Sequence, residues 1–325
     1  MFTMDWNIVF ETNGKRFKLG VLAECEIVCS VDNLADTATI VLPEAVMNQV
    51  LNIENKINRG SGVLIQLGYD GNLKTEFEGF IQEITTNDST LKIVCEDALF
   101  LFRVGVKDEE FKLVSLQRIA QRLIDQIDPS FKLVISGYSD AVYYEKFVIH
   151  QATGYDVLKK IQEETKANVF FNTEKKELHI HPPYIEKGGT VRYSMQQNIE
   201  KSALEFKKAI DKKIEVTVES VNIKGKINSV TVGTTGGDKT TIKATSPMTN
   251  YAMQKVADAA LKKNSFDGYS GSFDGWLIPF VKPTYSAIIE DQDYPYKDGT
   301  YYVVGVKTNF SESGGVRTIT PGIKL

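Results

Sequence analysis

The chain has 325 residues, of which 42% are hydrophobic and 25% are charged, so its composition is that of a globular protein with room for two or three domains. Its formal net charge of −4 at pH 7 argues against a dedicated nucleic-acid binder, which needs a basic face for phosphates. The N-terminus has no signal-peptide pattern, and no apolar run reaches the length of about 18 residues that a membrane span requires. The spacing of Cys25, Cys29 and Cys95 does not suit a disulfide framework.

Residues 1–108 have the pattern of short strands separated by turns. The expected strands cover 6–11, 16–19, 24–31 and 37–42, with further runs at 63–67 and 91–95. Asn13-Gly14 suits a tight hairpin turn, and Gly68-Tyr69-Asp70-Gly71 and Asn87-Asp88-Ser89 mark two more turns. Because no helical pattern separates these strands, we expect an antiparallel barrel or sandwich.

Residues 109–205 combine helical and strand patterns. Apolar residues at helical spacing predict a helix over 116–127, with Ser115 as its N-cap, and a second helix over 155–166. Strands are expected around them, at 132–135, 146–150, 169–172 and 177–181. This segment is therefore predicted to be a small α+β domain.

Residues 206–325 return to strands. These strands are expected at 213–221, 227–232, 285–290, 300–309 and 315–320. The polar run GTTGGDKTT is expected to be a loop. A helix over about 251–263, capped by Asn250, is expected to belong to the same unit. The end of this segment repeats the order seen near the start, because a strand leads to Asp298-Gly299, a second strand, a polar turn and a third strand, as at Glu78-Gly79. We therefore expect two related antiparallel barrels on either side of the α+β domain.

Two groups of residues suggest chemistry. Glu96 and Asp97 are neighbours on a strand and so point to opposite faces, which excludes a direct acid/base pair; we expect Glu96 to face solvent and Asp97 to cap the turn into ALFLF. His179 and His181 share one face of a strand, but zinc requires three or four ligands, and no cysteine or further histidine lies near them, since the remaining histidine is His150. We therefore predict no metal site.

Other signals of function are weaker. The sequence contains no GxSxG, HExxH, Walker-type or GxGxxG motif, so we predict no catalytic residue and no cofactor, although a Ser-His-Asp triad built from distant residues is left open. The basic run KKAIDKK at 207–213 is interpreted as a solvated strand entry. The last segment is rich in aromatic residues, for which we expect core or subunit-interface positions: Trp276, Phe280, Tyr285, Tyr294, Tyr296, Tyr301 and Tyr302. A carbohydrate-binding module is the alternative function, and a cell-wall hydrolase is a third.

Longer phrases carry a family resemblance. GVLIQLGYDG, FEGFIQEI and LKIVCED, followed by SLQRIAQRLIDQI, GYDVLKKIQEETKANVFFNTEKKELHIHPP and the closing YVVGVKTNFSESGGVRTITPGIKL, resemble the baseplate hub proteins of phage tails, in the late control gene D family, and the hub part of type VI secretion spike proteins. The resemblance covers nearly the whole chain.

The resemblance implies a homotrimeric ring in the baseplate of a virion tail. Each chain would supply two tail-tube-like barrels, so that three chains present six barrels and adapt a sixfold tail tube to a threefold central spike. The implied partners are the tube protein, the spike protein and a tape-measure protein, while DNA passes through the channel without specific binding. Because the sequence stops at Leu325 without a spike segment, the spike is expected to be a separate polypeptide, and a phage, prophage or phage-tail-like particle made in the bacterial cytoplasm is favoured.

Overall fold

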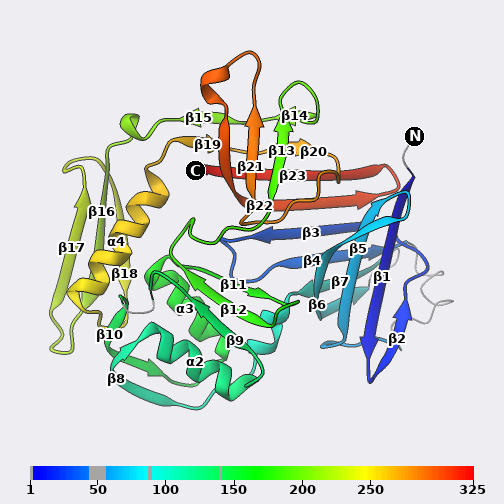
Figure 1. Cartoon of the computed structure of the whole chain (residues 1–325). Helices are drawn as coiled ribbons and strands as arrows, with labels where there is room; N and C mark the ends of the chain where they lie inside the picture. The colour runs from blue at the N-terminus through cyan, green and yellow to red at the C-terminus, as the bar shows by residue number, and fades with distance from the viewer. Residues whose placement is uncertain (1–2, 44–55, 87–89, 139–140) are drawn as a thin grey trace.

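The computed structural model describes residues 3–43, 56–86, 90–138 and 141–325. The described chain is mainly β: its N- and C-terminal strands form one large, mostly antiparallel sheet, and the helices lie together in the left-hand part of the view (Figure 1). The expected turn at Asn87-Asp88-Ser89 lies outside the described residues.

Seven strands form the N-terminal half of the largest sheet, in the order β3-β4-β7-β6-β5-β1-β2, with every neighbouring pair antiparallel. Their bounds are β1 Met4–Thr12, β2 Lys15–Lys18, β3 Glu24–Ser30, β4 Thr37–Leu42, β5 Gly62–Tyr69, β6 Asn72–Thr86 and β7 Leu91–Glu96. Buried and less buried positions alternate along β3 and β4, and the inward side chains form one apolar core. The predicted hairpin turn is confirmed, because Asn13 and Gly14 both have positive φ values of 48° and 72°.

The middle of the chain forms the α+β unit that the sequence predicts. It contains η1 Ala98–Phe102, β8 Glu109–Ser115, α2 Leu116–Ile127, β9 Lys132–Ile135, β10 Tyr143–Ile149, α3 Gly154–Thr165, β11 Asn168–Asn172 and β12 Glu177–His181. The Ser115 side chain accepts a hydrogen bond from the backbone N–H of Arg118, which confirms the predicted N-cap of α2. At α3, Thr153 and Asp156 form a reciprocal capping box.

A three-stranded sheet and one helix extend this middle unit. The sheet contains β16 Ile214–Val221, β17 Ile227–Gly233 and β18 Asp238–Ala244, and α4 Asn250–Asn264 packs across it (Figure 1). Apolar side chains of β16 and α4 belong to the same core as those of α2 and α3. The helix expected to accompany the second barrel therefore packs with the middle unit instead, because its buried stripe lies against β16 and β17.

Two local expectations in this region were wrong. The polar run GTTGGDKTT is a loop only in its first part, because Asp238 begins β18, which pairs in parallel with β16 and so buries Ile242. The N-cap of α4 is Thr249, whose side chain accepts a hydrogen bond from the Ala252 N–H, and Asn250 is the first helical residue.

The C-terminal strands form the other half of the large sheet. Their bounds are β13 Thr190–Ser194, β14 Lys201–Ser202, β15 Glu205–Lys207, β19 Gly268–Ser270, β20 Phe273–Gly275, β21 Ser286–Glu290, β22 Gly299–Ser311 and β23 Gly314–Lys324, with short helices η2 Ala209–Asp211 and η3 Pro295–Lys297 between them. The long hairpin β22–β23 lies at the centre of this half, and a separate apolar core packs against it.

The two halves are joined edge to edge. β22 pairs antiparallel with β3 from Gly305↔Ser30 to Ser311↔Glu24, so one continuous sheet runs across the molecule (Figure 1). No closed barrel is found among the described residues, and the predicted two-barrel arrangement is not confirmed. The edge of β3, which a closed N-terminal barrel would use, is occupied by β22.

Both halves nevertheless share a strand order. The order β3-β4-β7-β6-β5 in the first half corresponds to β14-β20-β23-β22-β21 in the second, in the same sequence along the chain and with antiparallel pairing throughout. The next strand differs in direction, because β1 is antiparallel to β5 while β13 is parallel to β21. The repeat predicted from sequence thus extends to five strands.

Candidate functional site

A cleft of about 740 Å³ lies where both halves of the large sheet meet the middle unit. Its walls come from the end of β3, from β6, from the β11–β12 hairpin, and from the segments 186–189 and 280–285. Three polar clusters surround it: a buried ion pair, a pair of aspartates and a pair of histidines.

The ion pair joins Arg317 of β23 to Glu76 of β6. Arg317 is 0% exposed, and its Nη2 lies 2.5 Å from Glu76 Oε1. The other guanidinium nitrogen, Nη1, donates to the carbonyl oxygens of Leu277 and Pro279 at 2.7 and 2.8 Å. Burial raises the pKa of Glu76, and the positive charge of Arg317 acts against that rise. The pair therefore fixes one half of the sheet against the other.

The aspartate pair includes one residue that the sequence singled out. Asp97 caps η1 by accepting from the Leu99 N–H at 2.8 Å, which confirms its predicted capping role, and its other oxygen accepts from the Asp36 N–H at 2.9 Å. Burial raises the pKa of Asp36 to about 6, and burial also raises that of Asp97, with the neighbouring Asp36 charge adding to the effect. Cys29 lies beside Asp36, and burial raises the pKa of its thiol, so this cysteine is not an activated nucleophile.

Glu96 does not face solvent as predicted. It is 2% exposed, and its two carboxylate oxygens accept from Arg103 Nε and Nη2 at 2.6 and 2.8 Å. Arg103 in turn lies 3.8 Å from the centre of the Tyr155 ring. Glu96 was misplaced because η1 turns the chain back and brings Arg103 over it, which strand alternation does not reveal. It is a structural residue rather than half of a catalytic pair.

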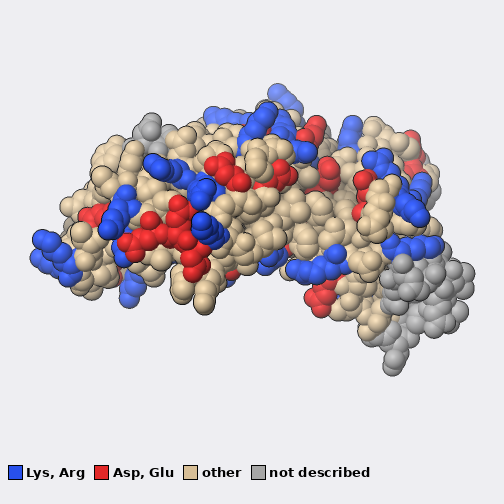
Figure 2. All heavy atoms as spheres, turned by 90° about the horizontal axis from the view of Figure 1, so that it is seen from below, with Lys and Arg blue, Asp and Glu red and all other residues tan. Residues whose placement is uncertain are grey.

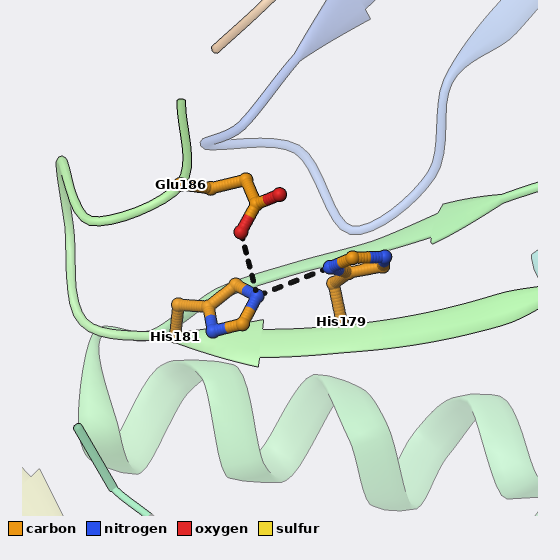
Figure 3. Close-up of side chains that lie close together, drawn as sticks. All are labelled: His179, His181 and Glu186. Atoms are coloured by element: carbon orange, nitrogen blue, oxygen red, sulfur yellow. Dashed lines mark hydrogen bonds and ion pairs between the residues drawn. The ribbon is translucent and has the colours of Figure 1, made fainter. Parts of the chain in front are cut away.

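His179 and His181 share one face of β12, as the sequence predicts, and a third donor joins them. His179 Nδ1 lies 3.1 Å from His181 Nε2, and Glu186 Oε2 lies 3.4 Å from the same Nε2 (Figure 3). The segment after Pro182-Pro183 turns back and points Glu186 toward both rings (Figure 3). Glu186 lies five residues downstream of His181, beyond Pro182-Pro183, so strand periodicity does not indicate that its carboxylate meets the two rings. His150 lies elsewhere, exposed and paired with Asp108.

The aromatic residues of the last segment divide into three groups, of which Phe280 and Tyr285 are half-buried and line the cleft. Tyr301 and Tyr302 are buried, which fits the core position favoured from the sequence. Tyr294 and Tyr296 are more than half exposed on η3, with ring centres 6.2 Å apart, and Trp276 is exposed at the end of β20.

Charged side chains of both signs are interspersed on the face seen from below (Figure 2). Two of the ion pairs among the described residues, Arg122–Glu109 and Lys146–Glu110, bring opposite charges within 2.9 Å of each other. That face therefore lacks the uniform basic surface that holds nucleic-acid phosphates. Within the described part of the chain, no helix has both the length and the apolar character needed to cross a membrane.

No protein-family model matches the sequence, and no curated protein matches it. Solved structures do match. The tail protein from Neisseria meningitidis MC58 has 14% sequence identity and a TM-score of 0.65, with 98% of this chain and 96% of that chain covered. The prophage MuSo2 43 kDa tail protein from Shewanella oneidensis has 14% identity and a TM-score of 0.63, with 98% of each chain covered.

A type VI secretion component is also similar. This Escherichia coli protein, described as structurally similar to the T4 bacteriophage tail proteins gp27 and gp5, has 8% identity and a TM-score of 0.59, with 99% of this chain and 77% of that chain covered. At these identities the likeness concerns the fold. The chain has the fold of these tail and secretion proteins along nearly its whole length.

Proposed function

We propose that this chain, which has the fold of phage tail proteins, is a structural baseplate hub of a phage or phage-like tail. The observation that carries the proposal is the five-strand order found in both halves and joined edge to edge at β3–β22. Two similar modules in a row are what a threefold ring needs in order to offer six similar docking surfaces. Each half, β1–β7 in the first case and β13–β15 with β19–β23 in the second, would then act as one tail-tube-like barrel. The predicted boundary 206–325 is not kept, because 214–264 packs with the middle unit.

The junction inside the chain suggests how chains join. The first part of β22 pairs with β21, and its second part pairs with β3. In the corresponding strand β6, the first part pairs with β5, but no described strand pairs with the outer edge of 82–86. β14, the counterpart of β3, likewise has no described strand on its outer edge.

A head-to-tail ring follows if these two edges meet. β14 of one chain would pair with β6 of the next, as β3 pairs with β22 within a chain, and rotation by 120° closes such a contact with three copies. Pairing also covers strand edges that would otherwise promote uncontrolled association. The ring would join a sixfold tail tube to a threefold central spike.

The remaining parts of the proposal concern partners and place. The tube protein and the central spike protein are the direct partners. A tape-measure protein and DNA pass through the channel without specific binding. The chain resides in the virion tail after synthesis in the bacterial cytoplasm. It is not an enzyme and does not insert into a membrane. The mixed charges of Figure 2 fit a surface that does not retain nucleic acid.

The test is a count of chains in the assembled particle. The hub is co-expressed with a candidate central spike protein, and the complex is studied by native mass spectrometry and by imaging of the tail tip. Three hub chains around the central channel are expected. Two or six chains, or a hub located away from the channel, would reject the proposal.

The second candidate function, carbohydrate binding, has one observation in its favour. Tyr294 and Tyr296 are exposed side by side, and Lys297 Nζ lies 4.0 Å from the centre of the Tyr294 ring. Exposed aromatic rings of this kind can stack on sugars. Binding of soluble cell-surface glycans by the wild-type chain, lost in Tyr294→Ala, would favour this function, whereas its absence leaves the hub.

A further inference from the structure

Three potential ligand atoms converge beside the cleft, on a strand and on the segment that follows it. His179 Nδ1, His181 Nε2 and a carboxylate oxygen of Glu186 all lie within 4.8 Å of one another (Figure 3). The two histidine side chains are 6% and 2% exposed, and Glu186 is 36% exposed. Among the described residues, this is the only group of three or more such side chains close enough to hold one metal ion.

The outer nitrogens of both rings already have partners. His179 Nε2 lies 3.2 Å from Glu177 Oε2, and a carboxylate accepts a hydrogen bond, so the ring proton belongs on Nε2. His181 Nδ1 lies 2.9 Å from Ser136 Oγ. A metal-binding histidine typically donates its second N–H to such a carboxylate or oxygen, which fixes its tautomer.

When the Ser136 hydroxyl accepts from His181 Nδ1, as Glu177 accepts from His179 Nε2, the two inner nitrogens carry lone pairs. Both rings then present a potential ligand atom to the same space as the Glu186 carboxylate.

The spacing of the three atoms suits a cation held between them. In a tetrahedral zinc site the metal–nitrogen distance of about 2.0–2.1 Å places two ligand atoms about 3.3 Å apart. The observed separations of 3.1 Å between the two nitrogens and 3.4 Å between His181 Nε2 and the Glu186 oxygen are close to this value, and the third pair of ligand atoms lies within 4.8 Å. Two histidines and one glutamate form a known ligand set for zinc.

We propose that His179, His181 and Glu186 bind one divalent metal ion of the zinc class. This proposal replaces the prediction from sequence that His179 and His181 bind no metal. His179 and Glu186 also line the cleft. Because Glu186 precedes β13 of the C-terminal half, the ion would tie the connecting segment 182–189 to β12 of the middle unit.

The first experiment measures zinc binding to the full-length chain after treatment with EDTA. Isothermal titration with ZnCl₂ and elemental analysis are expected to give one zinc ion per chain. Glu186→Gln keeps the size of a partly exposed side chain and removes the charged ligand, so it should weaken binding at least about tenfold, and His181→Gln should abolish it. Glu177→Gln should weaken binding by about 10–100-fold, the usual effect of losing a partner of a ligand.

His150→Gln is the matched control, because His150 is exposed and distant from the cluster in the fold. It should bind zinc like the wild type. Two further readouts do not depend on assembly: Co²⁺ should give the visible absorption of a four-coordinate ion, and a given concentration of ZnCl₂ should raise the Tm of the wild type more than that of Glu186→Gln. Absence of stoichiometric zinc, or equal binding by wild type, Glu186→Gln and His181→Gln, would overturn the proposal and leave a proton shared between the rings.

Discussion

Arg317 on β23 donates to Glu76 on β6, and the two residues are 241 positions apart in the sequence. Their ion pair is buried where the two halves of the large sheet face each other beside the cleft. A buried charge left without its partner is costly, so this contact couples the folding of the two halves.

Glu76→Gln is therefore expected to lower the free energy of unfolding by about 3–5 kcal/mol, because it leaves the Arg317 guanidinium buried without a counter-charge. Urea titration followed by circular dichroism measures the change. Glu11→Gln is the control, since Glu11 pairs with Arg16 at a site where both side chains are more than half exposed, and its effect should stay below about 1 kcal/mol. Equal effects of the two substitutions would contradict the assignment.

Stability should fall as pH rises through the range in which Asp36 ionises. Burial raises the pKa of Asp36 from 3.8 in the unfolded chain to about 6 in the fold, so the folded state holds its proton more tightly. The resulting stabilisation is complete below about pH 4 and is lost as pH rises toward about 6. Asp36→Asn, which keeps an acceptor for the Ser30 N–H, should flatten this part of the pH profile measured by urea unfolding. A profile that Asp36→Asn leaves unchanged would show that another group is responsible.

The capping box of α3 offers a local test. Thr153→Ala removes the side-chain oxygen that accepts from the Asp156 N–H and should cost about 0.5–2 kcal/mol of unfolding free energy. Thr153→Ser retains that oxygen and should remain within a few tenths of a kcal/mol of the wild type. Thermal unfolding of both variants at one pH distinguishes the cap from the loss of a methyl group.

Features set by neighbouring residues could be predicted from the sequence. The Asn13-Gly14 turn, the Ser115 cap and the Asp97 cap depend on side chains within three residues of the backbone groups they serve. Strand periodicity also indicated that His179 and His181 share a face, because that needs only the two-residue repeat of a strand.

Features set by distant packing could not be predicted in this way. Glu96 is buried because η1 returns Arg103 to it, and Glu186 meets the histidines because the chain reverses after Pro182-Pro183. The apolar stripe of α4 indicates that one face of the helix is buried, but it does not indicate which sheet covers that face. The sequence of β18 is mostly polar because only one face of this strand meets the core. The pairing of β22 with β3 leaves no local mark in either strand.

The proposed junction between chains can be tested at a single backbone group. The N–H of Ala203 points inward to the Ser272 carbonyl, so the N–H of the preceding residue, Ser202, points to the outer edge of β14. Ser202→Pro removes that donor and should leave the fold of the chain intact while lowering the fraction of trimer formed with the spike at least about tenfold. Ser202→Ala retains the N–H and serves as the matched control, with assembly like the wild type. Native mass spectrometry measures the trimer, and circular dichroism verifies folding; a Ser202→Pro chain that folds and still assembles fully would exclude β14 from the interface.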